Sequence, residues 1–364
     1  MNSDSTLTLL TREVPLIDVR SPVEFEQGAL PASRNLPIMN DAERHRIGRC
    51  YKQQGHDAAV ELGFELVHGH VRETRIEAWQ QLLKAHPEAH LYCFRGGQRS
   101  GIAAGWLREA GTPVQIIEGG YKRLRRTLLG LADTLPQTFD ITIVGGQTGT
   151  GKTIMVRDLE SFALDLEGCA NHRGSAYGAL PTGQPSQVDF EHACTVRLLQ
   201  LQTTGARRIV LEDESHRVGR VTVPPALFAA MADAPVAVIE EPLSARVERI
   251  FDEYVGIQHR LFAAIYGETY GFEAYAVYLR MALDAIRKRL GGARHSAVTA
   301  TLESALAHHA CGDLSVHRDW IEALLVEYYD PMYSWQLERK AERIVFRGDF
   351  VAVRDYLSAH REVG

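Results

Sequence analysis

The sequence predicts an α/β protein with two domains, each built on a parallel sheet, and a helical extension at the C-terminal end. Three observations carry this prediction. Short apolar runs alternate with stretches of helical periodicity, which is typical of parallel strands covered by helices. A glycine-bearing loop directly follows an apolar run once in each half of the chain. The chain has 364 residues, which is enough for two domains that each bury a core.

The first domain is predicted over residues 1–130. Its apolar runs are short and nearly free of charge, as expected for strands inside a sheet. A helical stretch with Ile102, Trp106 and Leu107 on one face separates two of these runs. The expected elements are, in chain order, a strand at Val14–Val19, a short helix at Pro22–Gly28, a strand at His90–Cys93, a helix at Ser100–Ala110 and a strand at Val114–Ile117.

The second domain follows a predicted linker over residues 131–139, where Gly130 and Pro136 interrupt the periodic pattern. An α/β core is predicted over residues 140–242 and a mainly helical part over residues 243–364. The expected elements are strands at Asp140–Val144, Arg208–Leu211 and Val236–Ile239, followed by helices within Ala245–Arg260 and Glu273–Arg289.

Composition and charge narrow the classes of function. Hydrophobic residues make up 45% and charged residues 24%, which is the balance of a globular protein. No apolar run could span a bilayer and Met1–Arg12 is polar, so we expect a cytoplasmic protein without a membrane partner. The net charge of -6 excludes indiscriminate coating of nucleic acid, although clusters such as Lys122–Arg126 could dock a folded RNA. The five cysteines lack zinc spacing, so we expect no structural metal.

The glycine-rich loop of the second domain fits the pattern G-x-x-x-x-G-K-[ST] and stands between a predicted strand and a predicted helix. Gly146, Gly149 and Gly151 would let backbone N–H groups surround phosphate oxygens. Lys152 would neutralise phosphate charge, and the hydroxyl of Thr153 would be a ligand if Mg²⁺ is used. The loop predicts a polyphosphate site but leaves the reaction open, because kinases, other NTPases and diphosphate-binding transferases share it.

Three acids follow a predicted strand of the second domain and look like a Walker-B element: Glu212, Asp213 and Glu214. Which of them meets a metal stays open, and one or two could be solvated loop charges. A polar segment between the two motifs predicts a substrate loop at the carboxyl edge of the sheet, although an ordinary polar loop has the same composition. Its candidate residues are Asp165, His172, Arg173 and Ser175.

The loop of the first domain places Cys93 at the end of a strand, before two glycines, two arginines and a helix. Backbone N–H groups, the helix N-terminus and the side chains of Arg95 and Arg99 would all favour a thiolate. The same groups would stabilise a persulfide or selenopersulfide on the sulfur. The spacing C-x5-R followed by Ser100 also fits the cysteine phosphatases, so this loop alone leaves both chemistries open.

Three further segments resemble the rhodanese family. Ile17–Phe25 reads IDVR-x-x-x-EF, Gly28–Pro37 reads G-x-x-P-x-[AS]-x-N-x-P, and Glu118–Tyr121 resembles the later glycine turn of that fold. The resemblance implies a rhodanese-like parallel-sheet domain and favours sulfur transfer over phosphatase chemistry. The usual rhodanese loop C-x-x-G-x-R-S is here one residue longer, which would suit a larger anion such as selenophosphate.

The order of a rhodanese-like domain and a P-loop domain, with six further motifs, closely resembles the bacterial tRNA 2-selenouridine synthase family over nearly the whole chain. The motifs are Cys50–Gly55, Arg95–Ser100, Asp165–Gly168, His172–Ser175, Leu211–Ser215 and Glu327–Tyr333.

The family resemblance implies a selenotransferase and geranyltransferase without a tightly bound cofactor; a need for Mg²⁺ stays open. Such enzymes geranylate 2-thiouridine at the wobble position of tRNAs for Lys, Glu and Gln with geranyl diphosphate. They then replace the S-geranyl group with selenium from selenophosphate, whose supplying enzyme is a further potential partner. We expect Lys152 and Thr153 to hold the diphosphate and Cys93 to carry or deliver selenium, with Arg95 and Arg99 as anion partners.

The C-terminal part would contact the tRNA. Arg287–Arg289 could bind phosphates, and Tyr328, Tyr329 and Tyr333 could stack a base, although core packing is the simpler explanation of these tyrosines. One alternative function is an ATP-dependent, rhodanese-fused tRNA sulfurtransferase or kinase. Another is a regulatory RNA- or nucleotide-binding protein that uses the cysteine loop as a sensor.

Overall fold

The computed structural model describes residues 3–359 of the chain. Residues 1–2 and 360–364, at the outer ends of the first and last predicted segments, lie outside the described residues. Within the described range, no helix combines the length and the apolar character needed to cross a membrane.

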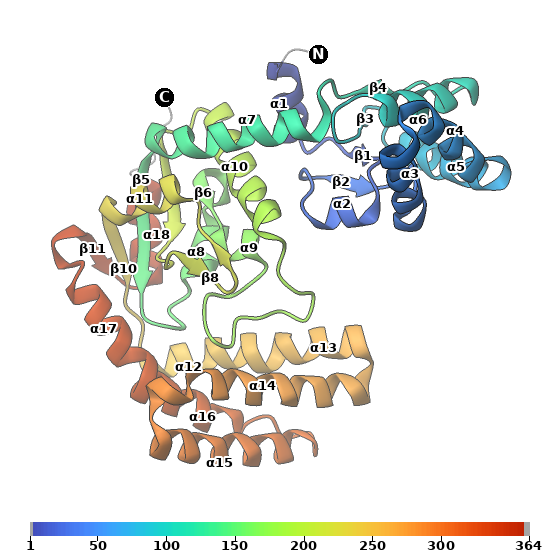
Figure 1. Ribbon diagram of the computed structural model, residues 1–364. Helices are drawn as coiled ribbons and strands as arrows, with labels where there is room; N and C mark the ends of the chain where they lie inside the picture. The colour runs from blue at the N-terminus through green and yellow to red at the C-terminus, as the bar shows by residue number, and fades with distance from the viewer. Residues whose placement is uncertain (1–2, 360–364) are drawn as a thin grey trace. The chain divides into compact units, whose positions relative to one another are not determined.

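The described chain forms two compact units, each with its own parallel sheet (Figure 1). Unit 1 contains the residues up to Leu135 together with Ser186–Gln200. Unit 2 contains Pro136–Pro185 together with the residues from Leu201 onward. The backbone therefore passes between the units three times, whereas the sequence predicted a single passage at a linker.

The sheet of unit 1 has four parallel strands in the order β2-β1-β3-β4, which confirms the predicted sheet. Asp18 on β1 pairs with Tyr92 on β3, and both side chains are fully buried. The strands are β1 (Leu16–Asp18), β2 (Ser33–Asn35), β3 (His90–Tyr92) and β4 (Gln115–Ile116), and the helices outside the β2–β3 connection are α1 (Ser3–Thr11), α2 (Pro22–Glu26), α6 (Gln98–Glu109) and α7 (Gly120–Thr134).

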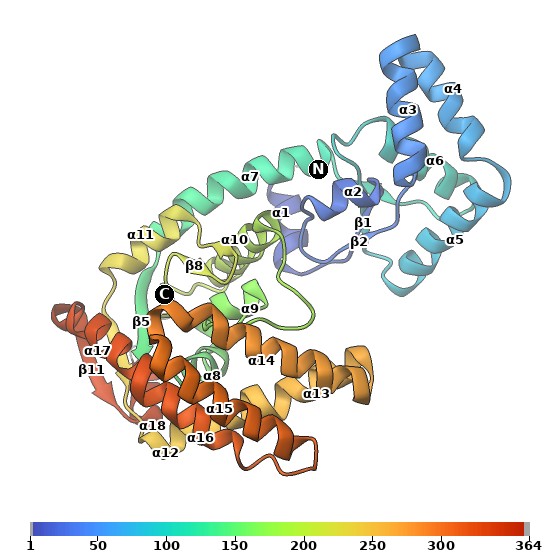
Figure 2. The same cartoon turned by 60° about the horizontal axis from the view of Figure 1, so that its bottom comes forward.

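Three helices connect β2 to β3, in a stretch for which the sequence analysis named no element. They are α3 (Asp41–Gln54), α4 (His56–Leu66) and α5 (Gly69–Ala85). Asn40 caps α3, since its side chain accepts a hydrogen bond from the backbone N–H of Glu43 at 2.9 Å. Gly55, with φ +87°, separates α3 from α4, which pack together as a pair (Figure 2).

The sheet of unit 2 has five parallel strands in the order β11-β10-β5-β7-β6. The strands are β5 (Asp140–Gly146), β6 (Ala163–Leu164), β7 (Arg208–Glu212), β10 (Val236–Ile239) and β11 (Ile344–Gly348). The other elements are the helices α8 (Lys152–Asp158), α9 (Leu166–Ala170), α11 (Pro225–Asp233) and α18 (Phe350–Ala359), the turn η2 (Glu160–Phe162) and a ribbon of β8 (Arg217–Val218) and β9 (Val221–Thr222). Helix α10 (Gln187–Thr203) belongs to unit 1 over most of its length.

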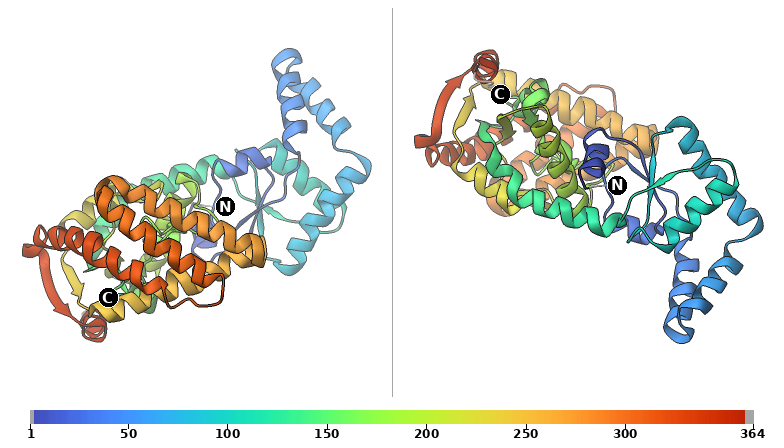
Figure 3. Two further views of the ribbon diagram at one scale, coloured as in Figure 1. Left: turned by 90° about the horizontal axis from the view of Figure 1, so that it is seen from below. Right: turned by 90° about the horizontal axis from the view of Figure 1, so that it is seen from above.

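The remaining helices of unit 2 lie side by side and share one apolar core (Figures 1 and 3). They are α12 (Leu243–Phe251), the π-helical turn η3 (Asp252–Ile257), α13 (Gln258–Tyr266), α14 (Glu268–Leu290), α15 (Gly292–His309), α16 (His317–Leu324), the π-helical turn η4 (Leu325–Tyr329) and α17 (Asp330–Glu338). The chain then passes through the turn η5 (Ala341–Arg343) and pairs β11 with β10. The helical part therefore interrupts the α/β core, because its last strand completes the sheet.

The predicted linker 131–139 is mostly helical. Helix α7 continues to Thr134, and the 3-10 turn η1 (Leu135–Thr138) follows. Gly130 is exposed on α7, whereas Leu128 and Leu135 are buried. Burial of this apolar face outweighs the cost of one helical glycine, about 1 kcal/mol.

Residues 186–200 pack in unit 1 although they fall inside the predicted core 140–242. Asp189 on α10 accepts a hydrogen bond from the backbone N–H of Ala29 at 2.7 Å. The Nδ1 atom of His192 lies 2.6 Å from the carbonyl oxygen of Ala29 and donates to it. Burial lowers the pKa of His192 to about 4, which keeps the ring neutral.

A chain of three histidines links α13, α15 and α16. Trp320 Nε1 donates to His317 Nδ1 at 2.9 Å, and His317 Nε2 lies 3.0 Å from His309 Nδ1. His309 Nε2 continues the chain to His259 Nδ1 at 3.3 Å. A single tautomer, with the proton on Nε2, satisfies every link. Burial, together with repulsion between the rings, lowers the pKa of His309 and His317 to about 4.

Acid should therefore destabilise unit 2 through this chain. The folded-state pKa values lie below the ordinary value of about 6.5, so the stabilisation is complete above that pH and disappears as pH falls from 6.5 to 4. We expect each histidine to contribute a slope of at most about 1.4 kcal/mol per pH unit to the free energy of unfolding. Denaturation of wild type, His317→Gln and the exposed control His308→Gln at several pH values checks this, and equal slopes for all three would contradict it.

Candidate active site

The cysteine loop lies at the carboxyl end of β3, where Cys93 is only 3% exposed. The sulfur lies 3.2 Å from the hydroxyl oxygen of Ser100 in the first turn of α6. Burial raises the pKa of the thiol, but hydrogen bonds from Ser100 and from the backbone N–H groups of Arg95 and Gly97 outweigh it, so the net pKa is lowered. The loop therefore stabilises an anion at Cys93.

The glycine turn Glu118–Tyr121 packs against the cysteine loop. The backbone N–H of Tyr121 donates to the carbonyl of Cys93 at 2.9 Å. A Cβ atom on Gly120 would lie 2.2 Å from that carbonyl oxygen, and one on Gly96 would lie 2.7 Å from the nitrogen of Gly119. Side chains at these glycines would push the loop and the turn apart, which explains why both segments contain glycine.

The two arginines of the loop occupy different positions. Arg99 forms an ion pair with Glu24 of α2, with N–O distances of 2.6 and 3.2 Å. Arg95 is exposed at the loop surface. Contacts to the sulfur come from Ser100 and the backbone, so the roles of Arg95 and Arg99 as anion partners stay predictions.

A buried ion pair fixes β1 beside the cysteine strand. Arg20 and Asp18 are 2% and 0% exposed, and Arg20 also donates to the carbonyl of Gly28 at 2.9 Å. The guanidinium of Arg20 lies 3.9 Å from the centre of the Tyr121 ring. These contacts connect the IDVR motif to the glycine turn that packs against the cysteine loop.

The P-loop follows β5 and leads into α8, as predicted. Gly146, Gly149 and Gly151 all have positive φ. The ammonium of Lys152 donates to the carbonyl oxygens of Gly146 and Gln147, at 2.8 and 3.0 Å. These contacts hold the lysine over the loop, where an entering phosphate would replace the two carbonyls as its partner.

Helix α12 closes against the P-loop. Arg246 forms a double hydrogen bond with Asp330, at 2.7 and 2.9 Å, and Arg249 donates to the carbonyl of Gly149. A Cβ atom on Gly149 would lie 2.9 Å from the carbonyl oxygen of Arg246. Two arginines from outside the motif therefore lie next to the phosphate loop.

Glu167 is the acid that meets the P-loop threonine, since Thr153 Oγ1 donates to its carboxylate at 2.6 Å. Glu167 and Glu214 share a hydrogen bond beside Lys152. Burial raises the pKa of Glu214 to about 8, with repulsion from Glu167 adding to it, and burial also raises the pKa of Glu167. Burial lowers the pKa of Lys152, which the acids offset only in part.

The three acids after β7 have three different environments. Glu212 is 1% exposed and accepts from the backbone N–H of Leu166 at 3.1 Å, and burial keeps its pKa well above the ordinary value. Asp213 forms an ion pair with Lys340, with one N–O distance of 2.6 Å. Glu214 shares a hydrogen bond with Glu167, and which of the three acids is functional stays a prediction.

The predicted substrate loop contains one helix-capping residue, one buried histidine and two residues that form hydrogen bonds to η3. Asp165 caps α9 through the backbone N–H of Gly168. His172 is buried, and burial lowers its pKa. Ser175 shares a hydrogen bond with the hydroxyl of Tyr254 at 2.8 Å, and Arg173 donates to the carbonyl of Glu253 at 3.2 Å. The loop is thus attached to η3 rather than free.

A narrow apolar cavity of about 20 Å³ borders the P-loop at Thr148. The ring of Tyr177 stacks on Trp320, with 5.4 Å between the centroids. The other lining residues are Ser175, Ile250, Tyr254, Ile321, Leu324, Leu325 and Tyr329. Tyr329, expected as a stacking platform for a base, is buried in this core, and Tyr333 lies with its ring 5.0 Å from the Lys152 ammonium.

Sequence reasoning missed four residues at the phosphate site: Glu167, Arg246, Arg249 and Lys340. Glu167 lies inside the Asp165–Gly168 motif, and that motif was the available signal. The other three are contributed by distant segments, and no local pattern marks them.

Comparisons with known proteins cover both units. The family model for the AAA domain of tRNA 2-selenouridine synthase matches residues 139–363, and the rhodanese-like domain model matches residues 4–127. A tRNA 2-selenouridine synthase of Hahella chejuensis is 47% identical, with 98% of this chain and 94% of that protein covered. Proteins of the same description from Bordetella bronchiseptica (48% identical; 96% and 95% covered) and Shewanella piezotolerans (45%; 97% and 96%) are similarly close.

Removing the hydroxyl of Ser100 should raise the pKa of Cys93, because a donor to the thiolate is lost. We expect an increase of about one unit for Ser100→Ala, which lowers the thiolate fraction at pH 7 about tenfold. The pH dependence of Cys93 alkylation, followed by peptide mass spectrometry, measures this. Ser296→Ala, which removes a hydroxyl from an exposed helix, is the control, and an unchanged profile in Ser100→Ala would refute the assignment.

Proposed function

The chain belongs to the tRNA 2-selenouridine synthase family, and from this premise we propose that it geranylates 2-thiouridine in tRNA and then exchanges the S-geranyl group for selenium. Geranyl diphosphate is the proposed prenyl donor and selenophosphate the selenium donor. The proposed substrates are the wobble positions of tRNAs for Lys, Glu and Gln, in the cytoplasm. A selenophosphate-producing enzyme is the proposed supplier.

One observation carries the geranyl part of this proposal: a complete P-loop borders an apolar, aromatic cavity at Thr148. The cavity is lined mainly by aromatic and aliphatic side chains, with the hydroxyls of Thr148, Ser175 and three tyrosines among them. A molecule with a diphosphate head and a hydrocarbon tail matches the loop and this lining in character. The cavity of about 20 Å³ has room for about one water, so it would have to open to admit the ten-carbon tail.

In the first step, the thiouridine sulfur attacks the first carbon of the geranyl chain. A carbon–sulfur bond forms, the carbon–oxygen bond breaks, and diphosphate leaves with the electron pair. The backbone N–H groups of the P-loop and the ammonium of Lys152 would stabilise the charge that develops on the leaving group. Arg249, now bound to the carbonyl of Gly149, is close enough to the loop to assist.

A magnesium ion would fit beside the diphosphate. Glu167 and Glu214 share a hydrogen bond, and burial raises the pKa of both, with repulsion from Glu167 adding to the rise at Glu214; a bound cation would favour the charged form of both acids. Thr153, Glu167 and Glu214 are the side chains that would hold it. When bound, the ion would supply additional neutralisation of the leaving diphosphate.

In the second step, selenium bonds to the base carbon and the carbon–sulfur bond to that carbon breaks. Geranyl thiolate leaves with the electron pair and takes up a proton, and water cleaves the selenium–phosphorus bond to release phosphate. We assign this step to the cysteine loop, since its backbone donors and Ser100 stabilise anionic sulfur or selenium at the position of Cys93.

Replacing Cys93 separates the two steps. Cys93→Ala should geranylate 2-thiouridine within about twofold of wild type but lose selenation by about a hundredfold or more, because only the second step is assigned to the cysteine loop. Mass spectrometry of the wobble nucleoside after reaction in vitro reports both products. Cys311→Ala, which removes an exposed thiol, should behave as wild type. Loss of both steps in Cys93→Ala would refute the division of labour.

Replacing Lys152 tests the ligand of the P-loop. Lys152→Ala should bind geranyl diphosphate at least about tenfold more weakly, equivalent to about 1.4 kcal/mol, since the buried cation is lost. Calorimetric titration measures this, with exposed Lys84→Ala as the control. Tight, Lys152-dependent binding and turnover of ATP, without binding of geranyl diphosphate, would instead establish an ATP-dependent sulfurtransferase or kinase.

A further inference from the structure

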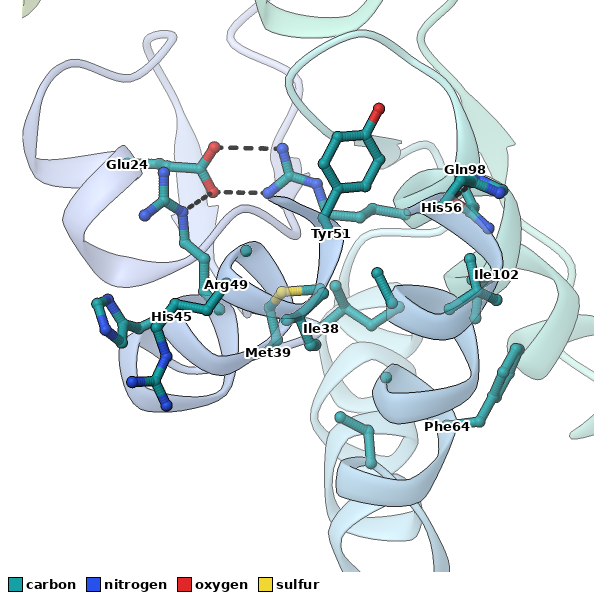
Figure 4. Close-up of a pocket in the computed structure, with 18 of the residues that line it drawn as sticks. Glu24, Ile38, Met39, His45, Arg49, Tyr51, His56, Phe64, Gln98 and Ile102 are labelled. Atoms are coloured by element: carbon teal, nitrogen blue, oxygen red, sulfur yellow. Dashed lines mark hydrogen bonds and ion pairs between the residues drawn. The ribbon is translucent and has the colours of Figure 1, made fainter. Parts of the chain in front are cut away.

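A larger cavity lies in unit 1 between α3, α4 and α6 (Figure 4). Its volume is about 700 Å³, within the range of about 300–1,000 Å³ typical of small-molecule sites. Gln98 and Arg99, at the end of the cysteine loop, form part of its wall. His56 of α4 contacts the side chain of Gln98 at 3.3 Å, which connects the helical insertion to the loop.

The floor of this α3–α4 cavity is apolar. Ile38, Val67 and Trp106 are buried beneath it, whereas Phe64 stays 47% exposed. The other apolar side chains of the floor are Met39, Ile47, Val60 and Ile102. A concave, mainly apolar cavity with a few polar groups at its edge is typical of a small-molecule site.

The rim of the cavity is cationic. Arg44, Arg49 and Lys52 surround it, and all three are exposed. Glu24 is the one acid among the lining residues, and Arg99 and Arg44 pair with it at 2.6 and 3.3 Å. The remaining positive charge matches an anionic ligand, and phosphates are the anions that arginine and lysine bind best.

We propose that the α3–α4 cavity binds the geranyl arm of the S-geranylated wobble nucleotide during selenium exchange. The rim cations then contact phosphates of the RNA on either side of that nucleotide. This proposal rests on the proposed function and deepens it. It gives the leaving group its own apolar site in unit 1, distinct from the cavity that borders the P-loop in unit 2.

Chemistry at the cysteine loop requires such a site. The group expelled by selenium carries ten carbons, which are unfavourable in water. A cavity that binds this chain beside the loop holds the breaking carbon–sulfur bond at the anion cradle. It also separates the S-geranyl intermediate from unmodified 2-thiouridine, because only the former gains apolar contacts.

Two glycines provide a way to fill the cavity without disturbing the helices. Gly48 on α3 and Gly63 on α4 both line it. A Cβ atom on Gly48 would meet no atom within 4 Å, and one on Gly63 would meet only Ile47, at 3.7 Å. Leucine favours a helix more than glycine does, so Gly48→Leu and Gly63→Leu should fold.

We expect both cavity-filling variants to geranylate 2-thiouridine RNA within about twofold of wild type. Their selenation of S-geranyl RNA should fall at least tenfold, mainly through a higher KM. Gly130→Leu, which adds the same side chain to an exposed position of α7 outside this cavity, should match wild type in both reactions. Wild-type selenation by Gly48→Leu and Gly63→Leu would overturn the proposal.

The rim is tested by charge reversal. Lys52→Glu should weaken binding of an anticodon stem-loop about equally with and without the geranyl group, because phosphate contacts do not read the base. Lys84→Glu, an exposed lysine of α5 outside the cavity, is the matched control. Unchanged RNA binding by Lys52→Glu, or equal losses in the two variants, would overturn the assignment of the rim.

A direct readout separates this proposal from the proposed function. An anticodon stem-loop whose geranyl arm carries a diazirine is photocrosslinked to the full-length protein, and the attached residues are mapped by mass spectrometry. Crosslinks to Ile47, Val60 or Phe64 support the cavity even if wild type shows no selenation, a result that would overturn only the proposed function. Crosslinks confined to Tyr177 or Trp320, or none at all, would overturn the cavity as the prenyl site.

Discussion

Both anion sites depend on backbone approaching backbone at the end of a parallel strand. In unit 1, a Cβ atom on Gly120 would lie 2.2 Å from the carbonyl oxygen of Cys93, and in unit 2 a Cβ on Gly146 would lie 2.7 Å from the carbonyl oxygen of Ile239. Such spacing leaves no room for a side chain, so glycine is required. Because the loops are held this closely, their N–H groups point at the anion before it arrives, and no reorganisation is needed when charge develops.

In each of the two loops, a charged side chain has a partner of opposite charge in the folded chain that its local sequence does not reveal. Arg99 is neutralised by Glu24, and Lys152 stands among Glu167 and Glu214, whose pKa values are both raised by burial, with repulsion from Glu167 adding to the rise at Glu214. The cysteine therefore takes its stabilisation from Ser100 and backbone dipoles rather than from a bound cation. The phosphate site instead groups the cation of Lys152 with the acids Glu167 and Glu214. Such a cluster of opposite charges is expected where a charged ligand binds and changes the protonation of its neighbours.

Local signals predicted the parts of the fold that short segments encode. Apolar runs located β1, β3, β5, β7 and β10, and the two glycine loops stand where those strands end. The insertion α3–α5 went unnamed because its first helix, α3, is strongly polar and has only Cys50 buried. Strand β11 was missed since it alternates half-buried and exposed positions inside a mainly helical region, and its role depends on pairing with β10 more than a hundred residues earlier.

The sequence alone located the two loops, because a cysteine loop and a P-loop are each written in contiguous residues whose spacing sets the backbone geometry. It also identified the family, through motifs spread along the chain. Only the tertiary structure decided which side chains complete each site. Lys340 reaches Asp213 across 127 positions, and residues 186–200 join unit 1 through Ala29, 160 positions away from Asp189. Such partners are chosen by burial and packing of the whole chain, which no local pattern records.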